Sequence, residues 1–236
     1  MSDGCTSCGN KGGCDSRKGG MFAAVDEALA RLYPTRRWAE RDEEAGFGAG
    51  VSAGEGAAVA RALAARLKAL AVHRPGTADE TCDYIYVLCF GRTPSLVQRL
   101  HGLVDGPDDD AELGDVEERY LRVALSSVAR FAGVQEVAMR GSRQPDVEGG
   151  ALVVTEESRT GVFDPILLKR FQGLVAVLAE HDIRHLDFGE ITEAPEGFDP
   201  GDYAERYGGG APAVANYLFF PQPAASVTTT VVTARP

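Results

Sequence analysis

The sequence predicts an α+β fold, and three observations point to it. Apolar residues repeat at helical spacing in four segments, whereas other short segments alternate or are continuously apolar, as strands do. Over residues 83–191 these segments follow the order β-α-β-β-α-β, with one further short helix after the first strand. Hydrophobic residues make up 44% of the chain and charged residues 25%, which is the composition of an ordinary globular protein.

Two helices are expected before residue 79. The first spans residues 21–33 and ends at Pro34, because proline cannot continue a helix. Residues 34–54 are expected to form a loop, and the second helix spans residues 55–73, before Pro75. Their buried stripes are Met21, Phe22, Val25, Leu29 and Leu32 in the first helix and Val59, Leu63, Leu67 and Leu70 in the second.

The strands are expected after residue 79. The segment 83–90 is apolar on both faces, which predicts a position inside its sheet rather than at an edge. Further strands are expected over residues 134–140, 151–155 and 184–191. Residues 216–220 and 226–233 are expected to form a C-terminal β-hairpin, which extends the sheet or pairs with a partner.

Three helices are expected among these strands. Thr93 and Pro94 open a short helix that reaches residue 104. Asp115 and Glu118 have the spacing of a capping box, which predicts a helix over residues 116–132. Asp164 and Pro165 open the third helix, which ends near His181. The stripes of the last two are Leu121, Ala124, Leu125, Val128, Phe131 and Ala132, and Leu168, Phe171, Leu174, Val175 and Leu178.

An antiparallel sheet with helices on one face would bury both of these stripes. The order of elements resembles a ferredoxin-like β-α-β-β-α-β sandwich. The chain is therefore expected to comprise a Cys- and Gly-rich segment over residues 1–20, a helical N-terminal region over 21–78 and an α+β domain over 79–236.

Charge and hydropathy exclude several classes of protein. The chain has 24 Lys and Arg against 35 Asp and Glu, so its net charge is −11, and a nucleic-acid binder would need a positive surface. No apolar stretch approaches the 18 residues of a membrane span, so no membrane insertion is expected. The N-terminal residues lack the basic and apolar regions of a secretory signal, and we expect a cytoplasmic protein.

The strongest functional signal is a group of cysteines near the start of the sequence. Cys5, Cys8 and Cys14 form a C-x2-C-x5-C pattern among six glycines. Thiolates at this spacing can bind one metal centre, and glycine lets the backbone wrap closely around it. Lys11 carries a positive charge between the cysteines, and Arg17 and Lys18 follow them. These cations favour the thiolate form and offset the negative charge of a bound cluster.

The number of ligands that this segment can supply indicates which metal centre it would bind. Structural zinc sites usually have four ligands in two pairs, whereas this segment supplies three cysteines and no histidine. An iron–sulfur cluster, with [4Fe-4S] as the expected type, accepts irregular spacing and a distant fourth ligand. Cys82 is the favoured fourth ligand and Asp15 an alternative, whereas Cys89 is expected to be a small buried residue of the core. Zinc and a metal-free segment with oxidisable thiols remain the alternatives.

These observations predict an iron–sulfur protein that transfers electrons or serves as an accessory or maturation subunit of a redox system, with a protein partner. The alternative is a non-enzymatic interaction module with a zinc-stapled or metal-free N-terminal arm, whose strand edges add to a partner's sheet. A metal-dependent enzyme is a third hypothesis. The sequence names no general acid or base for it and therefore no reaction.

Five other segments could have a function, but a simpler structural explanation competes with each one. The glycine-rich residues 46–56 lack the preceding strand of a dinucleotide-binding loop, and a flexible loop entering a helix is favoured. Residues 90–95 are expected to be an ordinary helix cap rather than an anion-binding site. The acidic residues 105–118 are expected to be a solvated loop rather than a calcium-binding loop. His181 and His185 fall on either side of a predicted helix end, which argues against a shared metal. The segment 33–38, with its tryptophan and two arginines, is interpreted equally well as a docking edge or as a loop anchored in the core.

Overall fold

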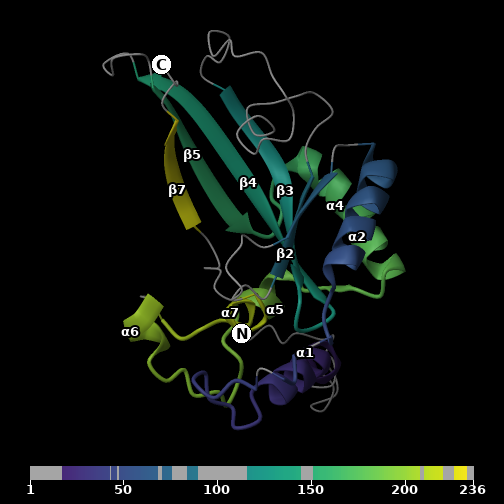
Figure 1. Ribbon diagram of the computed structural model, residues 1–236, viewed down its shortest axis with the longest axis vertical. Coiled ribbons are helices and arrows are strands. Elements are labelled where there is room, and N and C mark those ends of the chain that lie inside the picture. The colour runs from purple at the N-terminus through teal and green to yellow at the C-terminus, as the bar shows by residue number, and fades with distance from the viewer. Residues whose placement is uncertain are drawn as a thin grey trace, which may run out of the picture.

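The described part of the chain builds helices around one open antiparallel sheet, so the protein is a mixed α+β structure (Figure 1). The computed structural model describes residues 18–42, 44–46, 48–68, 71–75, 84–89, 116–144, 151–207, 210–219 and 226–232. The helices are α1 (Lys18–Leu32), α2 (Ala53–Leu67), α4 (Pro165–Glu180), α5 (Phe188–Thr192), α6 (Tyr203–Tyr207) and α7 (Val214–Leu218). The strands are β1 (Ala71–Pro75), β2 (Tyr84–Cys89), β3 (Val116–Ser126), β4 (Phe131–Gln144), β5 (Ala151–Thr160), β6 (Arg184–His185) and β7 (Ser226–Val232).

The sheet has the order β1-β2-β3-β4-β5-β7, and each strand of this series runs antiparallel to its neighbours. The short strand β6 pairs in parallel with the start of β4. Since β1 pairs with β2, residues of the predicted helical region 21–78 and of the predicted α+β domain 79–236 share one sheet.

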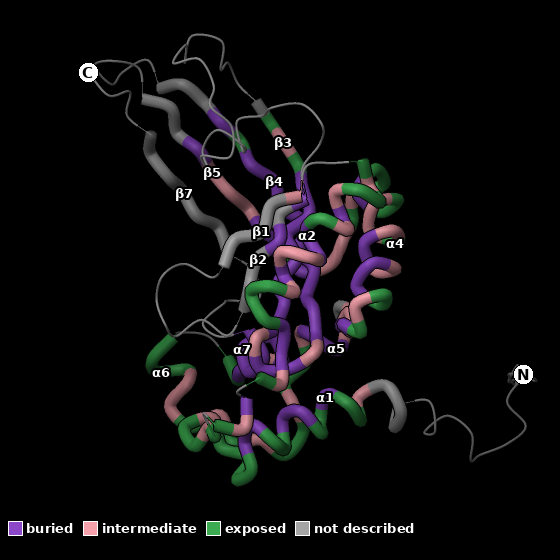
Figure 2. Tube along the Cα trace, turned by 45° about the vertical axis from the view of Figure 1, so that its right-hand side comes forward, coloured by how far each residue is buried: buried purple, intermediate pink, exposed green. Residues whose placement is uncertain are grey.

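The helices cover the two faces of the sheet differently. Helices α2 and α4 lie on one face, where side chains from β2, β3 and β4 pack against them (Figures 1 and 2). Helices α1 and α7 pack on the opposite face at one end of the sheet, around Ala124 and Phe131. The alternation of side chains along a strand explains how β3 serves both layers, with Leu121, Val123 and Leu125 on the first face and Ala124 on the second.

Several predicted elements are confirmed. The first helix is present, with Val25, Leu29 and Leu32 buried as its stripe predicts. The strand expected over residues 83–90 is β2, which lies between β1 and β3. The predicted strands 134–140 and 151–155 are the longer β4 and β5. Asp164 is the N-cap of α4, where its carboxylate accepts hydrogen bonds from the backbone N–H groups of Ile166 and Leu167.

The helix predicted over residues 116–132 is wrong, because most of this segment forms the strand β3. All residues from Tyr120 to Ser126 are buried, so the segment has no polar side that would reveal the period of two typical of strands. A continuous apolar run also contains helically spaced positions, and its pairing with β2 and β4 decides between them. The ferredoxin-like order required a helix here, and the described sheet instead passes directly from β3 to β4 and β5.

Three other segments also differ from the prediction. Helix α2 ends at Leu67 rather than at residue 73, because Lys68 takes a left-handed conformation with φ 48°, and β1 follows. The strand predicted over 184–191 ends at His185, since Asp187 and Glu190 form a capping box that starts α5. The predicted hairpin is wrong in its first arm, which forms α7, whereas its second arm is the strand β7 and extends the sheet by pairing with β5. The predicted short helix over 94–104 lies outside the described residues.

Candidate functional site

The predicted metal ligands lie outside the described residues. Cys5, Cys8, Cys14 and Cys82, together with Lys11 and Arg17, are not among the residues that the structure places. Within the part of the chain that is described, no group of three or more His, Cys, Asp or Glu residues is arranged to hold a metal ion. The metal centre at the cysteines therefore stays a prediction.

Helix α1 connects the cysteine segment to the body of the protein. It begins at Lys18, four residues after Cys14, and buries Val25, Leu29 and Leu32 against β3, β4 and α7. Arg31, in its last turn, donates a hydrogen bond to the carbonyl oxygen of Val128 at 3.2 Å. These contacts attach α1, the helix that follows the cysteine segment in the sequence, to the sheet.

Cys89 has the environment of a core residue. Its side chain projects from β2 into the layer beneath α2 and α4, and the residue is 2% exposed. Burial raises the pKa of its thiol to about 12, although the positive charge of Arg170 acts in the opposite direction. Burial among apolar side chains and a raised pKa are typical of a structural cysteine of the core. The prediction that Cys89 is a small buried residue is confirmed.

The two histidines of the HDIRH segment belong to different elements. His181 ends α4, and its backbone N–H donates to the carbonyl of Leu178. His185 lies on β6 with its ring edge-on to Phe171, and burial lowers its pKa. The helix ends between the two residues, as predicted.

The glycine-rich segment enters α2 through a capping box. The Ser52 hydroxyl accepts a hydrogen bond from the Glu55 N–H, and the Glu55 carboxylate accepts one from the Ser52 N–H. Gly50 is buried against the turn between β3 and β4, where an added Cβ would lie 2.0 Å from the carbonyl carbon of Ser127. The prediction of a loop that enters a helix is confirmed, and the glycine serves close packing against this turn.

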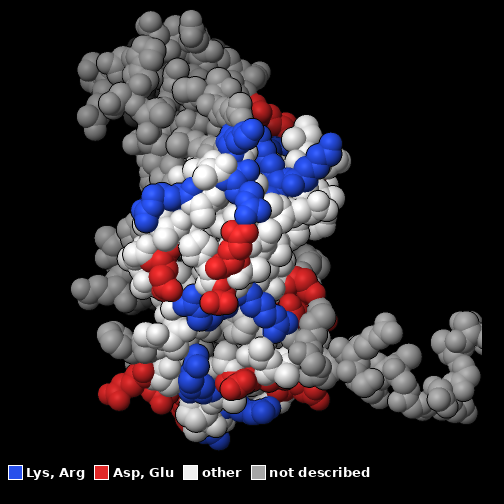
Figure 3. Space-filling model, turned by 90° about the vertical axis from the view of Figure 1, so that its right-hand side faces the viewer, with Lys and Arg blue, Asp and Glu red and all other residues white. Residues whose placement is uncertain are grey.

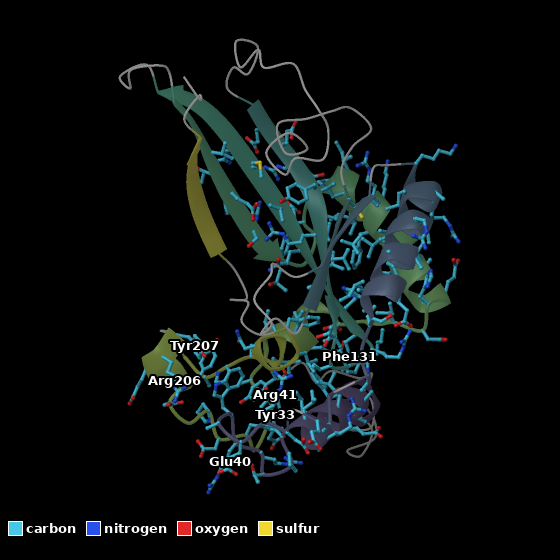
Figure 4. All side chains as sticks on the ribbon, viewed as in Figure 1. Tyr33, Glu40, Arg41, Phe131, Arg206 and Tyr207 are labelled. Atoms are coloured by element: carbon cyan, nitrogen blue, oxygen red, sulfur yellow. The ribbon has the colours of Figure 1, made fainter. Side chains whose placement is uncertain are left out.

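Aromatic residues of the segment 33–38 lie in the core. Tyr33 is 1% exposed and packs against Trp38 and Tyr217, with ring centroids 6.1 Å and 5.0 Å away. Phe198 and Tyr203 complete the group, which joins Tyr33 to Tyr203 on α6 and Tyr217 on α7. Tyr33 itself lies at the end of α1 (Figure 4). Of the two interpretations, the structure supports the loop anchored in the core.

A buried polar cluster on the sheet escaped the sequence analysis. Arg122 forms an ion pair with Glu156 and donates a hydrogen bond to the Tyr120 hydroxyl at 3.2 Å, and this hydroxyl donates to Glu156 at the same distance. Gln135 lies opposite Arg122 on β4, and Ser158 lies on β5 two residues from Glu156. Desolvation raises the pKa of Tyr120. The sequence predicts a helix over residues 116–132, and this prediction gives no reason to place Tyr120 and Arg122 beside Glu156.

A second buried carboxylate, Glu136 on the α2 and α4 face, joins the sheet to the start of α4. It is 1% exposed, and its Oε2 accepts hydrogen bonds from the N–H groups of Phe163 and Asp164, both at 2.7 Å. Its Oε1 lies 3.2 Å from the Arg119 guanidinium and 3.5 Å from that of Arg159. Its hydrogen-bonding capacity is used within the fold, which indicates a structural role.

Arg119 also takes part in other ion pairs, and charged residues are grouped on this side of the molecule. Lys and Arg gather in the upper part of the face that carries α2 and α4, and Asp and Glu lie mainly below them (Figure 3). Arg119 also pairs with Glu117, which lies 3.5 Å from Arg140. Mutual pairing between strands is an arrangement that exposed sheet faces commonly show, and each such pair adds little stability.

Comparisons with known proteins give no relative for this chain: no protein-family model, curated protein or solved structure matches it. Within the described residues, none of the helices combines the length and the apolar character that crossing a bilayer requires.

Proposed function

We propose that this protein is an iron–sulfur protein whose N-terminal cysteines bind a [4Fe-4S] cluster. Cys5, Cys8 and Cys14 supply three thiolate ligands and Cys82 the fourth, and Lys11 offsets part of the negative charge of the cluster. The cluster would supply one-electron transfer to or from a protein partner, either directly or as part of an accessory or maturation subunit of a redox system. The proposed location is the cytoplasm, where thiols stay reduced.

The observation that carries this proposal is the clustering of three cysteines within ten residues among glycines. The burial of Cys89 in the core favours a ligand set drawn from the other cysteines. The remaining four cysteines equal in number the ligands of a [4Fe-4S] cluster. Helix α1 follows the cysteine segment directly in the sequence and packs against the sheet through Val25, Leu29 and Leu32.

The proposal is tested by purifying the full chain without oxygen and measuring iron, acid-labile sulfide and the EPR spectrum after reduction with dithionite. We expect a brown protein that absorbs near ~400 nm and contains roughly four iron atoms per chain. Cys8→Ala is expected to lose the iron, and Cys89→Ala is the matched control that keeps it.

Three outcomes would contradict the proposal. A wild-type protein without iron and sulfide has no cluster, and a Cys8→Ala variant with full iron content does not use this ligand. A colourless protein with about one zinc per chain would instead favour the interaction module with a zinc-stapled arm.

A further inference from the structure

A cavity of about 380 Å³ lies between α1, α7 and the loop that follows α5. The loop is fixed at both ends. The carbonyl of Glu193 accepts a hydrogen bond from the Val214 N–H at 2.9 Å, and the carbonyl of Glu196 accepts one from the Arg36 guanidinium at 3.3 Å. The walls are therefore held in place by the fold. The lining residues are Phe22, Val25, Asp26, Glu193, Ala194, Pro195, Glu196 and Val214.

The lining combines an apolar floor with an acidic rim. Val25 and Val214 are 1% and 3% exposed and form part of the core beneath the cavity. The carboxylates of Asp26, Glu193 and Glu196 belong to exposed residues, and among the described residues no basic group lies within ion-pair distance of them. The nearby Arg36 guanidinium is instead bound to a backbone carbonyl and lies 5.5 Å from the ring centre of Phe198.

We propose that this cavity binds a lysine or arginine side chain from a basic segment of a partner protein. Such side chains have an apolar stem and a cationic head, so the stem would pack on Val25 and Val214 while the head meets the carboxylates at the rim. The volume lies at the lower end of the range for ligand sites, which suits one long side chain better than a large cofactor. The negative charges of Asp26 on α1 and of Glu193 and Glu196 on the loop also favour the approach of a basic surface.

The position of the cavity favours a protein as the occupant. Phe22, Val25 and Asp26 lie on α1, the helix that directly follows the cysteine segment. The helix that lines the cavity is thus the element that follows the proposed cluster ligands in the sequence. The inference concerns residues of α1, α7 and the loop, and it does not depend on whether a metal is bound.

The experiment is a fluorescence-anisotropy titration of the full chain with a labelled eight-residue peptide of alternating leucine and lysine. The same peptide with glutamate in place of lysine controls for the sign of the charge. We expect the triple variant Asp26→Asn, Glu193→Gln, Glu196→Gln to bind the lysine peptide at least ~10-fold more weakly than the wild type. The matched control, Glu27→Gln, Glu44→Gln, Glu205→Gln, changes the net charge equally at exposed positions outside the cavity and is expected to bind like the wild type.

A second variant tests the cavity without altering any charge. Ala194 lies in the lining and is exposed, so Ala194→Trp is expected to fill the space and weaken binding while thermal melting shows an unchanged fold. If melting shows that the triple variant is unfolded, Glu196→Gln alone replaces it.

Four results would overturn the proposal. Equal weakening by the two triple variants would show a general effect of charge, and unchanged binding by Ala194→Trp would show that the cavity is not used. Spermine that binds as tightly as the peptide would assign the cavity to a small amine. Self-association of the wild type that the Ala194→Trp variant abolishes would assign it to a second copy of the chain.

Discussion

Arg122 on β3 and Glu156 on β5 form an ion pair that crosses β4, on the side of the sheet facing away from α2 and α4. Their side chains are 10% and 20% exposed, so each charge depends on the other for compensation. The Tyr120 hydroxyl bonds to both partners. A buried pair of this kind makes the pairing of three strands specific, because any other register leaves a charge unpaired inside the protein.

Removing one partner of this pair is expected to destabilise the protein more than removing both. We expect Arg122→Met to lower the free energy of unfolding by about 2 kcal/mol, because it leaves the half-buried Glu156 without this cation. The double variant Arg122→Met, Glu156→Leu is expected to recover at least ~1 kcal/mol of this loss. Urea denaturation of the wild type, both single variants and the double variant measures the coupling. Strictly additive losses would show that the pair contributes nothing as a pair.

Among the carboxylates near the start of α4, Glu136 is expected to be the one whose substitution destabilises the protein most. Glu136→Gln removes the charge that faces Arg119 and Arg159, and its amide nitrogen cannot accept the hydrogen bonds that one carboxylate oxygen receives. We expect a loss of about 2–4 kcal/mol in the free energy of unfolding. Glu157→Gln on the neighbouring strand β5 is the control, and it should change stability by less than ~0.5 kcal/mol. A similar small effect at both positions would contradict the role given to Glu136.

Gly50 and Gly54 provide a matched pair within one loop and helix. An added Cβ at Gly50 would collide with the backbone of Ser127, whereas at Gly54 its nearest contact is the Ser52 hydroxyl oxygen at 4.0 Å. We expect Gly50→Ala to destabilise the protein by about 1–3 kcal/mol. Gly54→Ala is expected to be neutral or stabilising by up to ~1 kcal/mol, because alanine favours the helix. Thermal melting distinguishes the two variants, and a reversed order would disprove the packing argument.

The raised pKa of the buried Cys89 thiol predicts that the protein loses stability at alkaline pH. The unfolded thiol loses its proton near its ordinary pKa of 9.0, whereas the folded thiol keeps it up to about 12. Between these values the unfolded chain binds fewer protons, so this contribution is complete below pH 9 and falls as pH rises, by about 1.4 kcal/mol per pH unit.

Urea denaturation under reducing conditions at pH 8, 9 and 10 measures this slope in the wild type and in Cys89→Ala. The difference in stability between the two proteins is expected to shrink above pH 9, because the variant lacks the titrating group. Parallel curves would show that the thiol does not titrate on unfolding. Labelling with a thiol reagent at pH 8 should reach Cys89 only after the protein unfolds.

Elements with strong local signals were predictable from the sequence. Asp164 and Pro165 mark the start of α4, and Pro34 follows soon after the end of α1. The Asp187 and Glu190 capping box is an equally local signal for the start of α5, and it competes in the sequence with the alternation of Leu186 and Phe188, which favours a strand. Local hydrogen bonds and backbone geometry decide these positions, so neighbouring residues suffice to predict them.

The sequence by itself determined the α+β character of this protein, the burial of Cys89 and the grouping of three cysteines on which the proposed function is based. Only the tertiary structure decided that Val116–Ser126 is a strand and that Val214–Leu218 is a helix. Both segments are buried on more than one side, so their apolar residues carry no period, and the partners they pack against decide their conformation. The Arg122 and Glu156 pair and the acidic cavity depend in the same way on chain segments that meet only in the folded molecule.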